Sequence, residues 1–266
     1  MTRILFNCDD FGKTHQINAA ILHAHREGVL GSASLMVAGD AFDEAVEIAR
    51  ANPSLKVGLH LALCDAKPLL SGTQVPDLTG KDGHFLSPSA AGIRMAFCPK
   101  ARAQAVKEIG AQFDRFIATG LSRSHVDGHH HLHMHPFVFR ESVDWARKMG
   151  FARIRIVREF GNPLPPRRDL RGFAKKLIQH IIFAGLATAC NRMLVGSSLQ
   201  WLAGVLGLWE SGRISEDYLL GAIPRLPDGD WEIYVHIGSE GSEEELPAML
   251  SSSLKHLLQE RDIAVL

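Results

Sequence analysis

The sequence predicts an α/β fold with parallel strands, arranged either as an open doubly wound sheet or as a closed barrel. Short apolar runs alternate with stretches of helical periodicity along the 266 residues. Such alternation favours parallel βα units. Polar residues also follow several of the apolar runs, and parallel α/β proteins gather their catalytic groups at the carboxyl ends of strands.

The first predicted strand is the apolar run 3–8, which ends in the polar segment 9–12, DDFG. Thr14 can cap a helix that continues to about Arg26, because its hydroxyl can accept a hydrogen bond from the first helical turn. Apolar residues at helical spacing give this helix a buried stripe. Gly28 then ends it.

The rest of the chain repeats this pattern. Strands are predicted at 32–37, 56–63, 153–157, 231–237 and 263–266, and residues 122–126 lead into a histidine cluster. Helices are predicted at 41–51, 100–119 and 136–149, where glycine or proline marks the boundaries. Five chemically active side chains then lie at or just past predicted strand ends: Asp9, Asp10, His60, His129 and His236.

Two segments interrupt the alternation. Residues 69–99 are rich in proline, glycine and serine, which indicates a long excursion over the site. The second is an apolar excursion at about 161–210 within a single domain of residues 1–266. It fits either a buried pair of core helices or an apolar segment that serves as a lid or as a face in contact with a membrane. Four basic residues could then meet lipid headgroups, namely Arg171, Lys175, Lys176 and Arg192.

The composition is that of a soluble globular protein and narrows the choice of partners. Formal net charge is zero, with 29 basic and 29 acidic residues, so no positive field attracts nucleic acid. The four cysteines form no CxxC pair, which favours free thiols. Acidic residues appear by position 10, too early for a secretory signal peptide, so we expect a cytoplasmic location.

The adjacent pair Asp9 and Asp10 suggests divided roles at one strand end. One carboxylate can bind a cation while its neighbour remains free as a base. The alternative is structural: one of the two caps the following helix or makes an Asx-turn. A lone histidine in an apolar strand is more often a core residue than a ligand. We therefore interpret His60 as a metal ligand only if a second histidine lies close to it.

The cluster at residues 124–136, SHVDGHHHLHMHP, supplies that second histidine. Two imidazoles and one carboxylate make a mixed nitrogen and oxygen site that suits zinc and related divalent ions. Asp127 and His125 are candidates to orient the ligands from behind through hydrogen bonds. The alternative is an incidental histidine-rich loop.

Three further residues are candidates for work on the substrate. His236 lies near the end of a late strand, and an imidazole suits proton transfer at neutral pH. It could equally be a buried structural histidine. Arg155 and Arg158 could orient a substrate oxygen or form surface ion pairs.

These motifs together resemble the YdjC-like carbohydrate deacetylases. The resemblance rests on NCDDFG at 7–12, VGLHL at 57–61, SHVDGHHH at 124–131 and YVH at 234–236, in that order. It implies an irregular TIM-like (β/α) barrel similar to polysaccharide deacetylases. It also implies that Asp9 is the general base and that one divalent ion is bound by Asp10, His60 and His129.

The resemblance leaves the metal open between zinc and magnesium, with manganese, cobalt and nickel as further candidates. The sequence departs from the family pattern at Cys8, Gly128 and Ile237. In the family, the residue after this histidine is often proline, whereas Ile237 follows His236 here. This departure affects the expected role of His236 as the general acid.

A closer resemblance is to the hopanoid-biosynthesis branch, HpnK, through SLMVAG at 34–39, VPDL at 75–78 and EIY at 232–234. It implies removal of an N-acetyl group from an N-acetylglucosaminyl hopanoid, a lipid-linked amino sugar, with peripheral membrane contact. The alternatives are a chito-oligosaccharide deacetylase, a metal-dependent phosphoesterase and a non-catalytic sugar-lipid binding protein. The sequence is also compatible with a homodimer.

Overall fold

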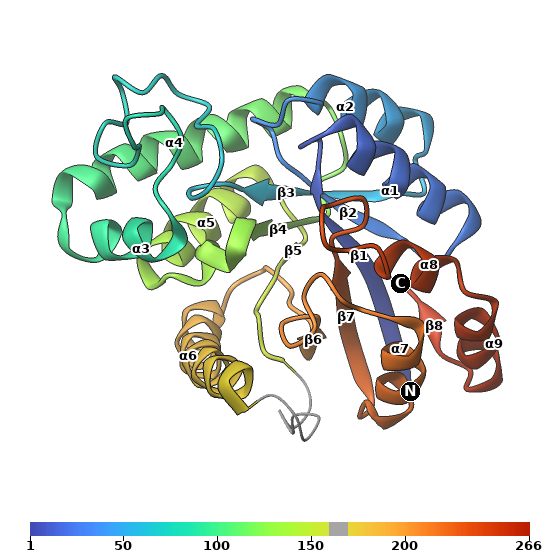
Figure 1. Cartoon of the computed structure of the whole chain (residues 1–266). Coiled ribbons are helices and arrows are strands. Elements are labelled where there is room, and N and C mark those ends of the chain that lie inside the picture. Colours follow the sequence, from blue (N-terminus) through green and yellow to red (C-terminus); the bar gives the residue numbers. More distant parts are fainter. Residues whose placement is uncertain (160–169) are drawn as a thin grey trace.

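The computed structural model describes residues 1–159 and 170–266, and it describes side chains in 1–159 and 177–266 (Figure 1). The predicted start of the apolar excursion at 161–169 therefore lies outside the described residues. So do the side chains of Arg171, Lys175 and Lys176.

In the described part of the chain, eight parallel strands form one sheet in the order β5-β4-β3-β2-β1-β7-β6, with β8 also paired to β1. Strands from both ends of the chain therefore share the sheet, because β1 contacts both β7 and β8. Their bounds are β1 Thr2–Phe11, β2 Ser32–Leu35, β3 Lys56–Leu61, β4 His125–Gly128, β5 Arg153–Ile154, β6 Gly204–Leu206, β7 Gly229–Val235 and β8 Ala264–Val265.

The sheet curls into an irregular barrel, as the resemblance predicted. Isolated parallel bridges link its two edges: Arg153 of β5 pairs with Gln200, which precedes β6, and Glu159, which follows β5, pairs with Val205 of β6. The amide of Val205 donates to the carbonyl of Arg158 at 2.9 Å. Closure thus depends on single bridges rather than on a full ladder of hydrogen bonds, which explains why the barrel is irregular.

Helices cover the outside of the curled sheet (Figure 1). The α-helices are α1 His15–Glu27, α2 Phe42–Ala51, α3 Pro88–Phe97, α4 Pro99–Ala118, α5 Pro136–Met149, α6 Leu170–Leu194, α7 Glu216–Ala222, α8 Glu245–Leu250 and α9 Ser252–Glu260. The 3₁₀ helices are η1 His129–Met134 and η2 Ile223–Arg225.

The helix boundaries follow the expected local chemistry. The hydroxyl of Thr14 accepts from the amide of Ile17 and so caps α1. Pro136 occupies the first turn of α5. Gly150 ends α5 in the left-handed conformation, at φ 74°, which a residue without a Cβ adopts at low cost.

The two interrupting segments differ from the predictions in detail. Residues 69–99 contain one helix, α3, which the low apolar periodicity concealed. The predicted pair of buried core helices is wrong: α6 is a single long helix, and only 17% of Leu177–Leu194 is buried. Further on, β6 joins the edge of the sheet, so part of the apolar excursion belongs to the barrel. In the described part of the chain, α6 alone has the length and apolar composition of a membrane-crossing helix.

Candidate active site

Asp9 and Asp10 both reach the carboxyl end of the barrel because β1 is irregular there. The register between β1 and β2 shifts between Cys8 and Phe11. Asp10 itself has a positive φ of 64°, in the left-handed region that aspartate tolerates better than most residues. Neither carboxylate caps α1, since Thr14 does so. The strained strand end therefore directs two adjacent carboxylates toward one site.

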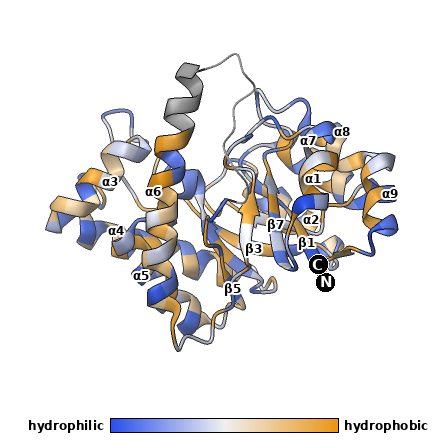
Figure 2. Cartoon of the chain, turned by 90° about the horizontal axis from the view of Figure 1, so that it is seen from below, coloured by the Kyte–Doolittle hydropathy of each residue, from blue (hydrophilic) through white to orange (hydrophobic). Residues whose placement is uncertain are grey.

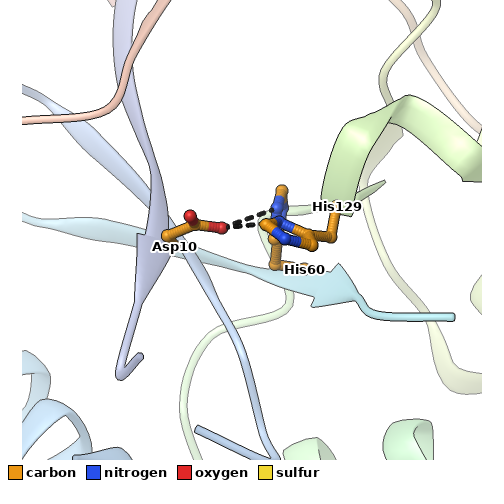
Figure 3. A group of neighbouring side chains, drawn as sticks. All are labelled: Asp10, His60 and His129. Atoms are coloured by element: carbon orange, nitrogen blue, oxygen red, sulfur yellow. Dashed lines mark ion pairs between the residues drawn. The ribbon is translucent and has the colours of Figure 1, made fainter. Parts of the chain in front are cut away.

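The structure brings Asp10, His60 and His129 together, as Figure 3 shows. One donor atom from each lies within 4.8 Å of the other two. Asp10 Oδ1 is 2.9 Å from His129 Nδ1 and 3.4 Å from His60 Nε2. All three side chains are buried. The three residues come from β1, β3 and the start of η1, so the sheet order, rather than the sequence, makes them neighbours.

The donor set fits a divalent cation. Asp10 Oδ1 is a buried oxygen that accepts no hydrogen bond of proper geometry from a described residue, although two imidazole nitrogens lie near it. Burial by itself lowers the pKa of His60, but the surrounding aspartates outweigh burial and raise that pKa to about 10. The surroundings thus favour positive charge at this point, which a metal ion can supply in place of a proton.

Asp127 contacts His60 of β3 on the side of the ring that faces away from Asp10. Its Oδ1 is 2.7 Å from His60 Nδ1, which leaves His60 Nε2 to face Asp10. Its Oδ2 accepts from the hydroxyl of Ser34 at 2.7 Å, and that hydroxyl also contacts His125 Nε2 at 3.0 Å. Such hydrogen bonds fix the orientation and the tautomer of a metal-binding imidazole.

The segment that carries His129 has an unusual backbone. His130 and His131 have φ angles of 50° and 56°, so two consecutive residues are left-handed inside η1. Gly128 precedes them, and a Cβ there would lie 2.9 Å from the carbonyl oxygen of Leu61 and 3.0 Å from His133. Glycine at position 128 is therefore required by the close approach of β3 and η1.

Arg155 corrects one prediction. Instead of forming a surface ion pair, it is buried and pairs with three carboxylates. Its Nη1 and Nη2 donate to the two oxygens of Asp9 at 2.9 and 2.8 Å. It also contacts Asp127 and Glu232 at 2.7 and 2.6 Å. These carboxylates outweigh burial and raise the pKa of the guanidinium, so Arg155 remains charged.

A second group of possible ligands, Asp9, His60 and Asp127, also converges. Arg155 already places its positive charge between the two aspartates of that group. A cation there would be repelled by the guanidinium at short range. The charge distribution therefore favours the site at Asp10 over this one.

His236 faces Asp9 across the site, with its Nε2 4.0 Å from Asp9 Oδ2. Its side chain is 25% exposed, so it is not the buried structural histidine of the alternative prediction. The amide of His236 donates to Oε2 of the buried Glu245, which fixes the end of β7. His236 lies therefore where a proton donor could meet a substrate.

An open cavity of about 310 Å³ lies over these residues. Asp9, Asp10, His129 and His236 line it, together with further residues from five segments: Lys13, His130, His131, Gln179, Leu208, Ser211, Gly212, Tyr234, Ser239, Glu240 and Ser242. Arg158 is exposed and is not among the described residues that line the cavity. Its expected contact with substrate is therefore not supported.

Some site residues escaped the sequence analysis. Lys13 Nζ donates to Asp10 Oδ2 at 2.8 Å, and Ser34 and Glu232 complete the buried network. Tyr234 contacts His131 Nε2 through its hydroxyl at 3.0 Å. The inward alternation of β7 could have indicated Glu232 and Tyr234, because residues two apart share one face of a strand. Lys13 and Ser34 carry no comparable local signal.

Fold and site together define a class: a curled parallel α/β barrel with a candidate one-metal centre at its strand ends. Within that class, the chain belongs to the YdjC-like protein family, whose profile matches residues 3–260.

Several relatives carry the name carbohydrate deacetylase. The relative from Vibrio parahaemolyticus serotype O3:K6 is 42% identical over 135 residues, which cover 50% of this chain and 51% of that protein. The relative from Brevibacillus brevis is 40% identical over 136 residues, or 51% and 52% of the two chains. The chain thus matches about half the length of these curated relatives.

A solved structure shares the fold over the whole chain. A protein of Enterococcus faecalis V583, provisionally named a cellobiose-phosphate cleavage protein, superposes with a TM-score of 0.73. The superposition covers 100% of this chain and 97% of that one, at 22% sequence identity. At this identity the likeness establishes the architecture alone.

Proposed function

We propose that this protein is a metal-dependent carbohydrate deacetylase that hydrolyses the N-acetyl group of an amino sugar. One observation carries the proposal. Asp9 is not one of the three candidate ligands Asp10, His60 and His129, and its carboxylate lies beside them on the wall of an open cavity. Amide hydrolysis needs a base next to an electrophilic centre. The names of the curated relatives agree with this chemistry.

Asp10, His60 and His129 would hold the ion. When bound, a divalent cation supplies polarisation of the acetamide carbonyl and lowers the pKa of water. One carboxylate and two imidazoles suit zinc, and manganese, cobalt, nickel or magnesium are the other candidates.

Asp9 acts as the general base in this proposal. It accepts hydrogen bonds from Asn7 and from two nitrogens of Arg155. A carboxylate has about four acceptor positions, so one is left for the proton of the attacking water. Arg155 fixes the direction of the Asp9 carboxylate through these two hydrogen bonds. His236, across the site, then donates a proton to the departing amine nitrogen, which releases acetate and a free amino sugar.

The substrate is an N-acetylated amino sugar, and we propose a lipid-linked form, the N-acetylglucosaminyl hopanoid of the HpnK branch. Support comes from the motifs at 34–39, 75–78 and 232–234 and from the apolar helix beside the cavity. A chito-oligosaccharide is the alternative substrate. A cytoplasmic location, peripheral to the inner membrane, and a homodimer belong to the same proposal.

The experiment that tests the function compares products by mass spectrometry. Metal-loaded protein is incubated with an N-acetylglucosaminyl hopanoid and, separately, with diacetylchitobiose. We expect the loss of one acetyl group and release of acetate from the hopanoid. Acetate from diacetylchitobiose alone would favour the chito-oligosaccharide, and no acetate from either would contradict deacetylation.

Metal content separates the remaining alternatives. One ion per chain agrees with the group at Asp10, whereas two ions would favour a phosphoesterase. A sugar-lipid binding protein without catalysis would bind the substrate and release no acetate.

Replacement of the proposed base gives a sharper test. Asp9→Asn preserves size but removes the basic oxygen, so we expect activity to fall by roughly 10²-fold or more. Metal content, measured by elemental analysis, should stay close to that of the wild type. Asp10→Ala is the matched variant, in which metal content itself should fall. Near-normal turnover by Asp9→Asn would exclude Asp9 as the base.

A further inference from the structure

Helix α6 presents an uncovered apolar face to solvent. Ile178, Ile181 and Ile182 are 60%, 62% and 54% exposed. Their i, i+3 and i+4 spacing places them on one side of the helix. The segment Leu177–Leu194 has a mean hydropathy of 1.2. Soluble monomers rarely leave a contiguous apolar stripe uncovered unless it binds something.

The opposite face of α6 already supplies the packing that holds the helix. Ala187, Cys190 and Leu194 are buried, and α6 contacts α5 and η1. The thiol of Cys190 lies 3.7 Å from the carbonyl oxygen of Met134. The isoleucines are thus not needed for the fold. The inner face of α6 packs against α5 and η1. The helix therefore cannot leave the barrel to cross a membrane without losing these contacts.

The uncovered face adjoins the cavity. Gln179, between two of the isoleucines in sequence, lines the cavity wall. One turn further, the ring of Phe183 meets His131 edge-on at a centroid distance of 5.7 Å. Figure 2 shows α6 along the outside of the molecule, with hydrophobic residues in its described part. Any partner of this face would therefore lie beside the entrance to the site.

The charge of α6 indicates which kind of partner its apolar face binds. Residues 170–194 contain no aspartate or glutamate but include Arg171, Lys175, Lys176 and Arg192. Arg192 is exposed, and it follows Ile181 by about three helical turns, so it lies on the same side of α6 as the isoleucines, about 16 Å further along the axis. A second copy of the chain would bring like charges together. An anionic lipid surface complements both features, because its acyl chains can cover the isoleucines and its headgroups can pair with the basic residues.

We propose that α6 docks on an anionic lipid surface, lying in the interface with its isoleucine face toward the acyl chains. This docking would bring the mouth of the cavity to the headgroup layer, where the sugar of a lipid-linked substrate is found. That consequence for the substrate rests on the proposed function. The docking itself does not.

Vesicle co-sedimentation tests the docking. The full chain is mixed with vesicles of phosphatidylcholine alone or of phosphatidylcholine with phosphatidylglycerol. We expect binding that is stronger to the anionic vesicles. The variant Ile178→Ser/Ile181→Ser/Ile182→Ser should bind at least about tenfold more weakly, because it loses apolar burial. Arg192→Gln should weaken binding to anionic vesicles by about fivefold, with little effect on neutral ones.

The matched control is Ile93→Ser/Phe97→Ser on α3, two apolar side chains that are 62% and 82% exposed. This control should bind vesicles like the wild type. The proposal is overturned if the wild type ignores both vesicle types, or if the control and the α6 variant lose binding equally. It is also overturned if light scattering shows a lipid-free dimer that only the α6 variant abolishes.

Hydrolysis of a soluble N-acetylated sugar, assayed without vesicles, keeps this inference distinct from the proposed function. The α6 variant should retain that activity, which also shows that it has folded. Vesicle binding by a wild type that releases acetate neither from the N-acetylglucosaminyl hopanoid nor from diacetylchitobiose would reject the function and leave the docking intact. Hydrolysis without vesicle binding would support the proposed function and reject the docking.

Discussion

Arg155 balances the buried negative charge of the site. Removing it would leave Asp9, Asp127 and Glu232 buried without their shared cation. We expect Arg155→Met to lower the free energy of unfolding at neutral pH by about 3–5 kcal/mol, as for other broken buried ion pairs. Urea denaturation measures this loss. The deficit should shrink in acid, because protonation neutralises the abandoned carboxylates.

The control for this prediction is Arg3→Met. Arg3 forms an exposed pair with Asp230 on the outside of the barrel, so solvent screens it and stability should change little. Equal effects of the two substitutions would mean that the buried network contributes no more than a surface ion pair.

Glu159 is a second buried residue with a testable charge. Burial raises its pKa to about 8, although the amides of Leu208 and Gly207 donate to it. The folded state therefore binds a proton more tightly than the unfolded state does. This contribution to stability is fully present below the ordinary glutamate pKa of 4.5 and is lost as pH rises through about 8.

We accordingly expect Glu159→Gln, which is neutral at every pH, to gain stability relative to the wild type as pH rises from 5 to 8.5. Urea denaturation at several pH values gives the difference in the free energy of unfolding, which should change by roughly 1.4 kcal/mol for each pH unit between 5 and 8. Parallel pH profiles for the two proteins would mean that Glu159 is ionised in the folded state throughout this range.

At the scale of elements, the approach of β3 to β4 sets the geometry around His60, one of the candidate ligands. A Cβ on Gly58 would lie 2.5 Å from three ring carbons of His125, whose Nε2 contacts the same Ser34 hydroxyl that donates to Asp127. Gly58→Ala should therefore displace the His125 ring, costing roughly 1–3 kcal/mol of stability as other overpacked sites do. Metal affinity should fall with it, because Asp127 orients His60.

Calorimetry with metal titration checks both effects. Gly72→Ala is the control, since nothing lies within 4 Å of a Cβ at that position. If Gly58→Ala keeps both the stability and the metal affinity of the wild type, the two strands accommodate the added methyl group without displacing His125.

Across the whole molecule, an ion at Asp10, His60 and His129 would join three elements that are far apart in sequence. Binding only to the folded state stabilises it by about 2.7 kcal/mol when the free ion is at 100 times its Kd. For a chain of this size we expect a rise in Tm of roughly 5–10 °C. Thermal unfolding with zinc and with a chelator measures it.

Asp10→Ala is the control for that measurement and should show no rise. A similar rise in Asp10→Ala would place the stabilising ion elsewhere, for example at the exposed histidines of η1 or at surface carboxylates.

The sequence by itself determined the class of fold and the residues that could bind a metal. Apolar runs, caps and glycine stops are local signals, and local hydrogen bonding and periodicity decide them. The predicted α1, with its Thr14 cap, and α5, with Pro136 and Gly150, are confirmed. So is the arrangement of parallel strands.

Only the tertiary structure decided how distant side chains pair. Arg155 and Asp9 are 146 positions apart, and no local pattern predicts that a guanidinium will be buried among carboxylates rather than left at the surface. The same holds for α6, whose apolar stretch is compatible with a core helix or with a surface helix. Which one forms depends on the area that the barrel leaves for it, because burial is a property of the assembled molecule and not of the segment.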